Sequence, residues 1–357
     1  MKNSLTVFVV GAGASKEVGL PIASELIDII ADKIDFQLER GTIRDDRGDA
    51  DILDVIQEAS PGRVEINAFF DAANRLRNGV IFSNSIDSFI DVHRHDEKIL
   101  RLGKLAIGKT ILEREGNSYL QIEGSKFKHA EELRATWFVR LFKNLCDGVR
   151  KSEMHTLFEK IAFVVFNYDR CIEHFLFNAI KLHFGITTDE AAEIMKTLRI
   201  IHPYGSVGTL PWEDRNGIPF GFEGSRETLK FVEKRIKTYT EQVEDLNTIK
   251  NIRSLVESAD ALVFLGFSYH PQNMTLIDPS DDCAAEEVFG TAFGISNNDV
   301  AIINDRIRVL VGRNLDPLRH VVEGVSMREC VFIRNDLTCA SLLDEFSRSL
   351  FTAGPLR

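Results

Sequence analysis

The segment LTVFVVGAGASKEVGLP, residues 5–21, constrains the fold most, because an apolar run ends there at a glycine-rich turn. The β-branched and aromatic residues 5–10 predict a strand buried on both faces, which is typical of a parallel sheet. Gly11 and Gly13 lack the Cβ atoms that would keep a phosphate from backbone N–H groups, and Ser15 adds a hydroxyl donor. The turn favours phosphate binding, although such glycines also serve for backbone packing alone.

An alternation of strand and helix patterns organises the rest of the chain. Pro21 and Ser24 open a predicted helix, and after residue 160 short apolar runs alternate with helical periodicity. Strands are predicted at 161–166, 198–201 and 261–265, with further strands in EEVFGTAFGIS and CVFIRN. Helices are predicted at 170–184, 228–258, 298–311 and 338–351. This order predicts an α/β fold with a Rossmann-like parallel sheet.

Residues 40–155 interrupt that alternation. They contain charged and turn-forming stretches and helical periodicity, with no convincing strand, and Ser85 is placed to cap a helix. We therefore predict a helical insertion lobe at 40–155 and a core formed by 1–39 and 156–357. His93 and His95 stand at i and i+2, do not share a helix face, and are expected to be solvated rather than to bind a metal.

Composition limits the classes of function. The 357 residues are 44% hydrophobic, which permits a large core, and the net charge of −11 argues against direct nucleic-acid binding. We expect a cytoplasmic protein, since we find no signal peptide and no run of about 18 apolar residues. The five scattered cysteines form no CxxC pair and are expected to be reduced packing residues. The 25 phenylalanines fit an oligomer interface or a large core.

Polar or glycine residues follow each predicted strand. In a parallel sheet these carboxyl ends share one edge, where ligands bind. Outside the glycine turn, the residues in question are Asn167, Asp169, His202, Tyr204, Gly205, Ser206, Gly266 and Ser268. Taken singly, each has a structural explanation, because Asn167 and Asp169 can cap a helix, His202 can be a loop histidine and Gly266 a turn glycine. Their joint occurrence at successive strand ends favours one binding cleft.

The ordered set GAGAS with GLP, then FNYD, HPYGS and LGFS, resembles the NAD-binding core of sirtuins. The resemblance covers residues 5–21 and about 161–270, under half of the chain. It implies that Asn167 and Asp169 hold the nicotinamide end of NAD and that His202 is the catalytic base, with Tyr204 as the reserve. It also implies cofactor contacts from Gly11, Ala12, Gly13, Ser15, Pro21, Tyr204, Gly205, Ser206, Gly266 and Ser268.

Departures from the sirtuin pattern disfavour protein deacylation. The zinc-binding cysteine pairs of deacylating sirtuins are missing, and IASEL follows GLP where deacylases have an aspartate, a phenylalanine and an arginine. Tyr204 precedes Gly205 where deacylases place the catalytic histidine, and His202 lies two positions earlier. We assign the base to His202 on chemical grounds, since a neutral imidazole is the better base near pH 7. No metal is expected at this centre.

The helical insertion, with SIDSFID and KLAIGKTILERE, resembles the sirtuin-like proteins of bacterial antiphage defence. That resemblance implies an NAD hydrolase that releases nicotinamide and ADP-ribose and depletes NAD in the infected cell. It also implies a homo-oligomer that acts with a sensing partner, such as a HerA-like ATPase or an Argonaute-type protein. Two alternatives stay open: a non-catalytic module that binds NAD or ADP-ribose, and an NAD-dependent deacylase or ADP-ribosyltransferase.

Overall fold

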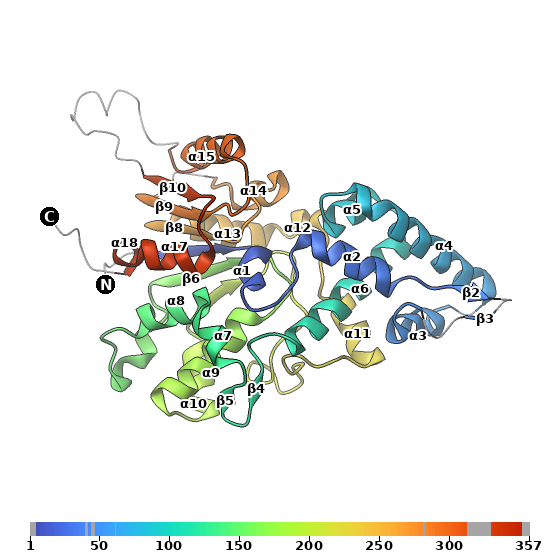
Figure 1. Ribbon diagram of the computed structural model, residues 1–357, viewed down its shortest axis with the longest axis horizontal. Coiled ribbons are helices and arrows are strands. Elements are labelled where there is room, and N and C mark those ends of the chain that lie inside the picture. Colours follow the sequence, from blue (N-terminus) through green and yellow to red (C-terminus); the bar gives the residue numbers. More distant parts are fainter. Residues whose placement is uncertain are drawn as a thin grey trace.

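A six-stranded parallel sheet forms the centre of the protein (Figure 1). The computed structural model describes residues 5–39, 42–43, 47–60, 62–280, 283–312 and 330–351. The sheet comprises β1 (Thr6–Val10), β6 (Ile161–Val165), β7 (Arg199–Ile201), β8 (Ala261–Leu265), β9 (Glu287–Thr291) and β10 (Val331–Arg334). All of its neighbouring strands pair in parallel, so their carboxyl ends lie along one edge. The predicted α/β class is confirmed.

The strand order is that of a Rossmann fold. Across the sheet it is β10-β9-β8-β1-β6-β7, and counting the strands along the chain turns this into the order 6-5-4-1-2-3. The direction of winding reverses between β1 and β8, which pair directly with Val10 opposite Leu265. Ligands of such sheets bind beyond the carboxyl ends of the strands at this reversal point. The fold therefore places the glycine turn after β1 at the expected ligand edge.

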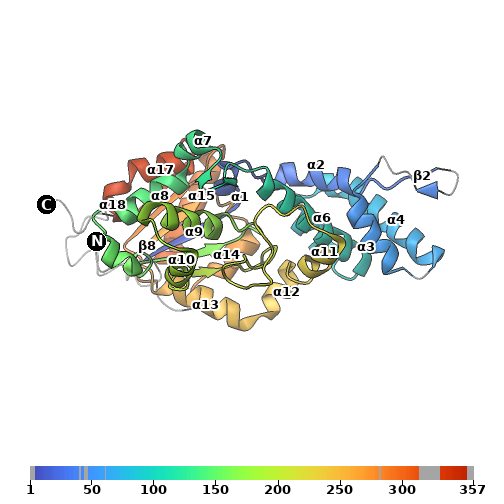
Figure 2. The ribbon, with the colours of Figure 1, turned by 90° about the horizontal axis from the view of Figure 1, so that it is seen from below.

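Helices cover both faces of the sheet, because successive side chains of each buried strand point to opposite sides. Phe8 and Val10 pack with one buried cluster, and Val7 and Val9 pack with the other. Figure 2 shows α13 on one side of the sheet and α8 and α17 on the other. The helices around the sheet are α1 (Ala12–Lys16), α7 (Ala130–Arg134), α8 (Trp137–Cys146), α9 (Cys171–Phe184), α10 (Thr188–Met195), α12 (Tyr239–Glu244), α13 (Leu246–Glu257), α14 (Pro271–Ile277), α15 (Asn297–Val311), α17 (Cys339–Glu345) and α18 (Ser347–Phe351).

A second group of helices, which we call the helical bundle, lies beside the sheet (Figures 1 and 2). It packs around α6, which contacts α2, α3, α4, α5 and α11. Ser85 accepts a hydrogen bond from the Ser88 N–H, as a capping residue does at the start of α5. The members of the bundle are α2 (Ala23–Lys33), α3 (Ala50–Glu58), α4 (Arg63–Gly79), α5 (Ile86–Val92), α6 (Glu97–Gly116) and α11 (Arg226–Glu233), with the short 3-10 helix η1 (Val80–Phe82).

The helical bundle does not coincide with the predicted insertion lobe at 40–155. α2 and α11 lie outside that range and pack on α6, whereas α8 lies inside it and packs against α9 and α17. One buried cluster also runs continuously from the bundle to one face of the sheet, from Leu102 on α6 to Val9 on β1. Packing therefore crosses the predicted boundaries in both directions. The division into a core and an insertion lobe stays a prediction.

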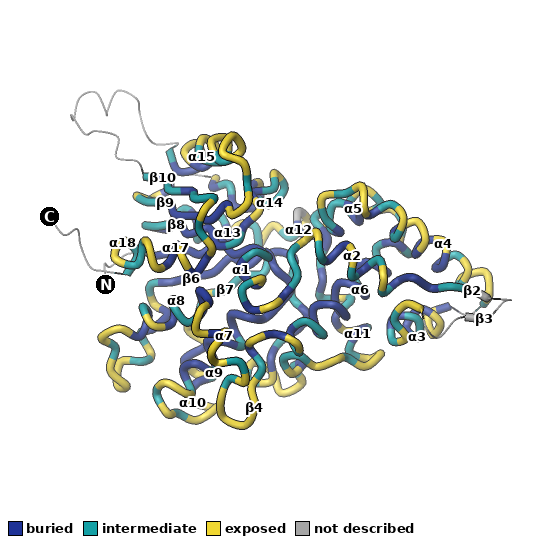
Figure 3. The backbone as a smooth tube through the Cα atoms, viewed as in Figure 1, coloured by how far each residue is buried: buried dark blue, intermediate teal, exposed yellow. Residues whose placement is uncertain are grey.

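Short local elements complete the described chain. β2 (Leu38–Glu39) pairs with β3 (Thr42–Ile43), and β4 (Ile122–Glu123) pairs with β5 (Lys126–Phe127). β3, β4 and β5 lie within residues 40–155, where we predicted no strand. The 3-10 helix η2 (Lys151–Thr156) leads into β6. Figure 3 shows buried sheet strands beneath helices whose outer sides are exposed. Among the helices of the described residues, none combines the length and the apolar character needed to span a membrane.

Candidate functional site

The glycine turn packs directly on the end of β8. The N–H of Gly11 donates to the Leu265 carbonyl at 2.9 Å, and the N–H of Gly13 donates to the Gly266 carbonyl at 3.0 Å. A Cβ on Gly13 would lie 2.8 Å from the Gly266 Cα, and one on Gly266, whose φ is +56°, would lie 2.0 Å from the Ala14 nitrogen. Backbone packing therefore explains these glycines, and a phosphate at this turn would need N–H groups other than those of Gly11 and Gly13.

Ser15 joins the glycine turn to the end of β6. The Asn167 carboxamide Nδ2 donates to the Ser15 Oγ at 2.9 Å, and the Ser15 hydroxyl lies near enough to Asp169 to lower the pKa of that carboxyl. Burial nevertheless raises the pKa of Asp169, although the Cys171 N–H, which donates to Oδ1 at 3.1 Å, and the Ser15 hydroxyl oppose this rise. Ser15, Asn167 and Asp169 are all at least nine-tenths buried. The structure thus brings together three of the predicted site residues from two neighbouring strand ends.

His202 has a different environment from the one expected for a general base. Its Nδ1 lies 2.9 Å from the Asn167 carbonyl oxygen, and its Nε2 lies 2.8 Å from Oε1 of Glu173 on the first turn of α9. Burial lowers the pKa of His202, but the Glu173 carboxylate and the Asn167 carbonyl outweigh burial and raise the pKa to about 8. Both ring nitrogens are engaged, so the ring offers no free lone pair to a water or a ribose hydroxyl.

Tyr204, the reserve base, belongs to a polar junction between the strand ends and the helical bundle. Its hydroxyl donates to Asn273 Oδ1 on α14 at 2.7 Å, and burial raises the pKa of Tyr204 well above the usual value. The neighbouring Tyr168 hydroxyl donates to Asp87 on α5 at 2.5 Å. Burial raises the pKa of Asp87, with Tyr168 opposing the rise. Tyr204 therefore stays protonated near neutral pH and acts as a donor.

The remaining predicted cofactor contacts are spread along the same edge. Ala12 and Pro21 are half-buried, and Ser268 is exposed. Gly205 has a φ of +72°, and a Cβ there would lie 2.0 Å from the Arg235 carbonyl oxygen, so a close approach to the segment after α11 requires glycine. Ser206 hydrogen-bonds Gly208 within its own loop. The predicted contacts of these residues with a cofactor stay predictions.

A buried ion pair that we did not predict from the sequence lies beside the site. Arg170 and Glu115 are 1% and 0% exposed, and the guanidinium binds the carboxylate through two hydrogen bonds of 2.5 and 3.1 Å. Arg170 also donates to the Ile218 carbonyl, and Glu115 accepts from the Gly221 N–H. The pair fastens the end of α6 to the residue that follows Asp169. Arg170 directly follows the FNYD segment, and this position next to the predicted site was the one sign in the sequence that Arg170 belongs to it.

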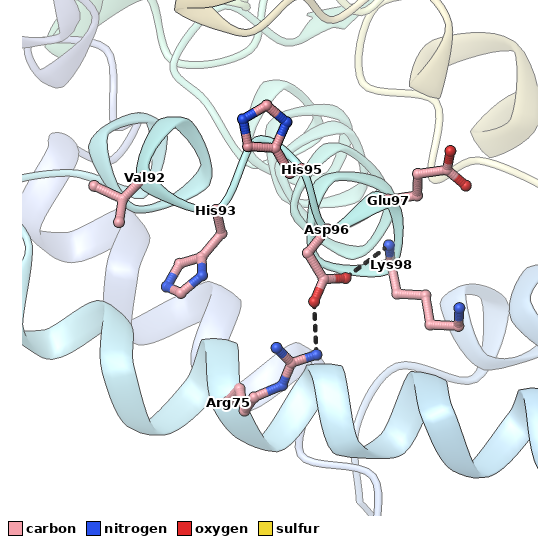
Figure 4. Close-up of a pocket in the computed structure, with 7 residues that line it drawn as sticks. All are labelled: Arg75, Val92, His93, His95, Asp96, Glu97 and Lys98. Carbon is pink, nitrogen blue, oxygen red and sulfur yellow. Dashed lines mark hydrogen bonds and ion pairs between the residues drawn. The ribbon is translucent and has the colours of Figure 1, made fainter.

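Two sizeable cavities lie away from these residues. One of about 560 Å³ opens on the helical bundle, where Arg75 pairs with Asp96 and the His93 and His95 rings point apart (Figure 4). Another, of about 360 Å³, is a mostly apolar groove between α7, α8 and α9. Neither is lined by a residue predicted for the NAD site. Within the described ranges, no group of three or more histidine, cysteine, aspartate or glutamate side chains is placed to hold a metal.

Comparison with known proteins adds no family to this description. No protein-family model matches the chain, and no curated protein matches it in sequence.

Proposed function

We propose that the protein binds NAD at the carboxyl edge of the sheet and hydrolyses its N-glycosidic bond to nicotinamide and ADP-ribose. The hydrogen bond between Asn167 and Ser15 is the observation that carries the proposal. It couples the turn after β1 to the polar end of β6 beside the winding reversal of a Rossmann sheet, where dinucleotides bind. The sirtuin-like order of the sequence segments gives the same ligand.

Hydrolysis of the N-glycosidic bond depends more on how the site positions the substrate than on a strong base. Nicotinamide is a good leaving group, and the transition state carries positive charge on the ribose, so the site must orient the substrate and stabilise that charge. We assign Asn167 to orient a ribose hydroxyl or the attacking water, and Asp169, when ionised, to lie near the developing positive charge. Burial of Ser15, Asn167 and Asp169 strengthens such interactions by excluding bulk water. His202 holds the backbone of Asn167 rather than removing a proton.

The test is direct measurement of nicotinamide release. Purified protein is incubated with NAD, alone and with its candidate ATPase partner, and the products are separated by chromatography. We expect Asn167→Ala to lower the rate by about 100-fold or more, a loss typical of removing an orienting group. Asn144→Ala, on α8 with its carboxamide bonded to the Arg140 carbonyl, is the matched control and should keep the wild-type rate. Equal rates in both variants would refute the assignment.

One observation favours a second candidate, a module that binds NAD or ADP-ribose without turnover. Both ring nitrogens of His202 are engaged and Tyr204 is held protonated, which leaves neither of the two predicted bases available. Saturable ADP-ribose binding by calorimetry, with no nicotinamide released under any condition, would favour this function over hydrolysis.

The biological setting forms part of the same proposal. We propose an NAD-depleting effector of bacterial antiphage defence that is cytoplasmic, self-associates and acts with a HerA-like ATPase or another sensing protein. A net charge of −11 supports leaving any DNA contact to that partner. Co-purification of the chain with the product of a neighbouring ATPase gene, followed by NAD measurement in infected cells, tests this setting.

A further inference from the structure

The Glu173–His202 pair lies directly behind Asn167. α9 begins at Cys171, and its first turn carries Glu173, which is 6% exposed, toward the end of β7. There the Glu173 carboxylate lies 2.8 Å from His202 Nε2, while the opposite ring nitrogen lies 2.9 Å from the Asn167 carbonyl oxygen. The imidazole thus bridges a buried carboxylate and the backbone of the residue whose carboxamide holds Ser15.

The partners of the ring determine its protonation state. A carbonyl oxygen and a carboxylate are both acceptors, so the imidazole satisfies both when each nitrogen carries a proton. The titratable groups that face His202 are Glu173 from α9, Asp169 from the loop after β6, and Glu213 from the loop after β7. All three favour the cation when they are ionised, and a charged pair of this kind offsets the cost of burying the ring.

We propose that Glu173 is a positioning residue, which keeps His202 as an imidazolium so that its Nδ1–H fixes the Asn167 backbone and holds the Asn167 carboxamide on Ser15. The inference deepens the proposed function and rests on it for the effect on turnover. When the ring loses one proton, the Glu173 carboxylate retains the Nε2–H, so the Nδ1 lone pair faces the Asn167 carbonyl oxygen and the two repel. The bridge to Asn167 would then loosen as the pH rises above about 8, the pKa of His202.

The experiment compares wild type with Glu173→Gln. The glutamine amide can donate to a neutral Nε2, so the variant keeps a hydrogen bond while losing the charge. We expect the wild-type ring to titrate near pH 8 by NMR. In Glu173→Gln, burial should prevail and carry the pKa of His202 below its ordinary 6.5. The Asn167 carboxamide signals should follow the same titration in the wild type.

Turnover supplies the second measurement. At pH 7.5 we expect Glu173→Gln to keep kcat for nicotinamide release and KM for NAD within about threefold of wild type, because the glutamine amide donates to Nε2 and the neutral ring keeps its Nδ1–H on the Asn167 carbonyl. The fall of kcat that the wild type shows above about pH 8 should be absent from Glu173→Gln, because its neutral ring still holds Asn167. The exposed Glu193→Gln on α10 is the matched control and should leave both quantities unchanged.

The outcomes separate this inference from the proposed function. An alkaline fall of kcat near pH 8 that Glu173→Gln retains, or wild-type Asn167 signals that do not follow the ring titration, would overturn the positioning role. If wild type releases no nicotinamide, the proposed hydrolase function fails by itself. The NMR titration then decides on positioning: a linked shift of His202 and Asn167, lost in Glu173→Gln, supports the role, and unlinked shifts reject it.

Discussion

Replacing Glu115 by glutamine should destabilise the protein strongly. Glu115 is fully buried and accepts from Arg170 through both carboxylate oxygens, at 3.1 and 2.5 Å. The amide would turn donor hydrogens toward the guanidinium and leave a buried charge without its counter-charge. Breaking a buried pair in this way costs about 3–5 kcal/mol. We place Glu115→Gln near the lower end, about 3 kcal/mol, because Arg170 keeps its hydrogen bond to the Ile218 carbonyl.

A control on the same helix isolates the effect of burial. Glu113 pairs with Lys33 at 2.7 Å, but its side chain is 31% exposed, so Glu113→Gln should cost under about 1 kcal/mol. The free energy of unfolding is measured in urea by tryptophan fluorescence. A third protein, with Glu115 and Arg170 both replaced by methionine, should recover much of the lost stability because no charge is left unpaired. If the free energy of unfolding of Glu115→Gln lies within about 1 kcal/mol of the wild-type value, the pair does not stabilise the protein as its geometry indicates.

Two further predictions concern stability. Burial lowers the pKa of His174 to about 4, and the Nε2–H of the neutral ring donates to the Leu120 carbonyl at 3.0 Å. The stability that the neutral ring contributes is therefore present above pH 6.5 and lost as the pH falls toward 4. The loss should reach about 3 kcal/mol relative to His174→Gln in urea titrations at stepped pH, and parallel curves for the two proteins would exclude it. Gly13→Ala should cost about 1–3 kcal/mol, because its Cβ would lie 2.8 Å from the Gly266 Cα, whereas Gly62→Ala, with its nearest neighbour at 3.6 Å, should cost far less.

The sheet was predictable because three of its strands are short apolar runs that can be recognised from the local sequence. Residues 6–10, 161–165 and 261–265 are short apolar runs, buried along almost their whole length, and each is followed by glycine or by polar residues. Parallel pairing follows from the helices between the runs. Chain composition could not place α2 and α11 on α6, since an amphipathic face specifies burial but not the partner that provides it.

The side-chain chemistry of the site was predictable only in part. The sequence placed Ser15, Asn167 and Asp169 at one edge, and the structure joins them. It could not distinguish a glycine that admits a phosphate from a glycine that admits another backbone, because both uses require only the absence of a Cβ. It also could not show that Glu173, 29 residues from His202, takes up the second ring nitrogen. Which group contacts a histidine nitrogen depends on tertiary structure, and the spacing of residues along the sequence does not show it.

Residues 167–173 connect several parts of the molecule that meet at the strand ends. Their side chains hold the glycine turn, both bundle helices that reach the site, and the end of β7, through the pairs Asn167–Ser15, Tyr168–Asp87, Arg170–Glu115 and Glu173–His202. Two of these four pairs cross to the helical bundle, on α5 and α6. The helical bundle is therefore bonded to the same short segment that carries the Asn167 carboxamide. Because the segment is buried and these four pairs hold it, we expect a displacement of α5 or α6 to be transmitted to the Asn167 carboxamide.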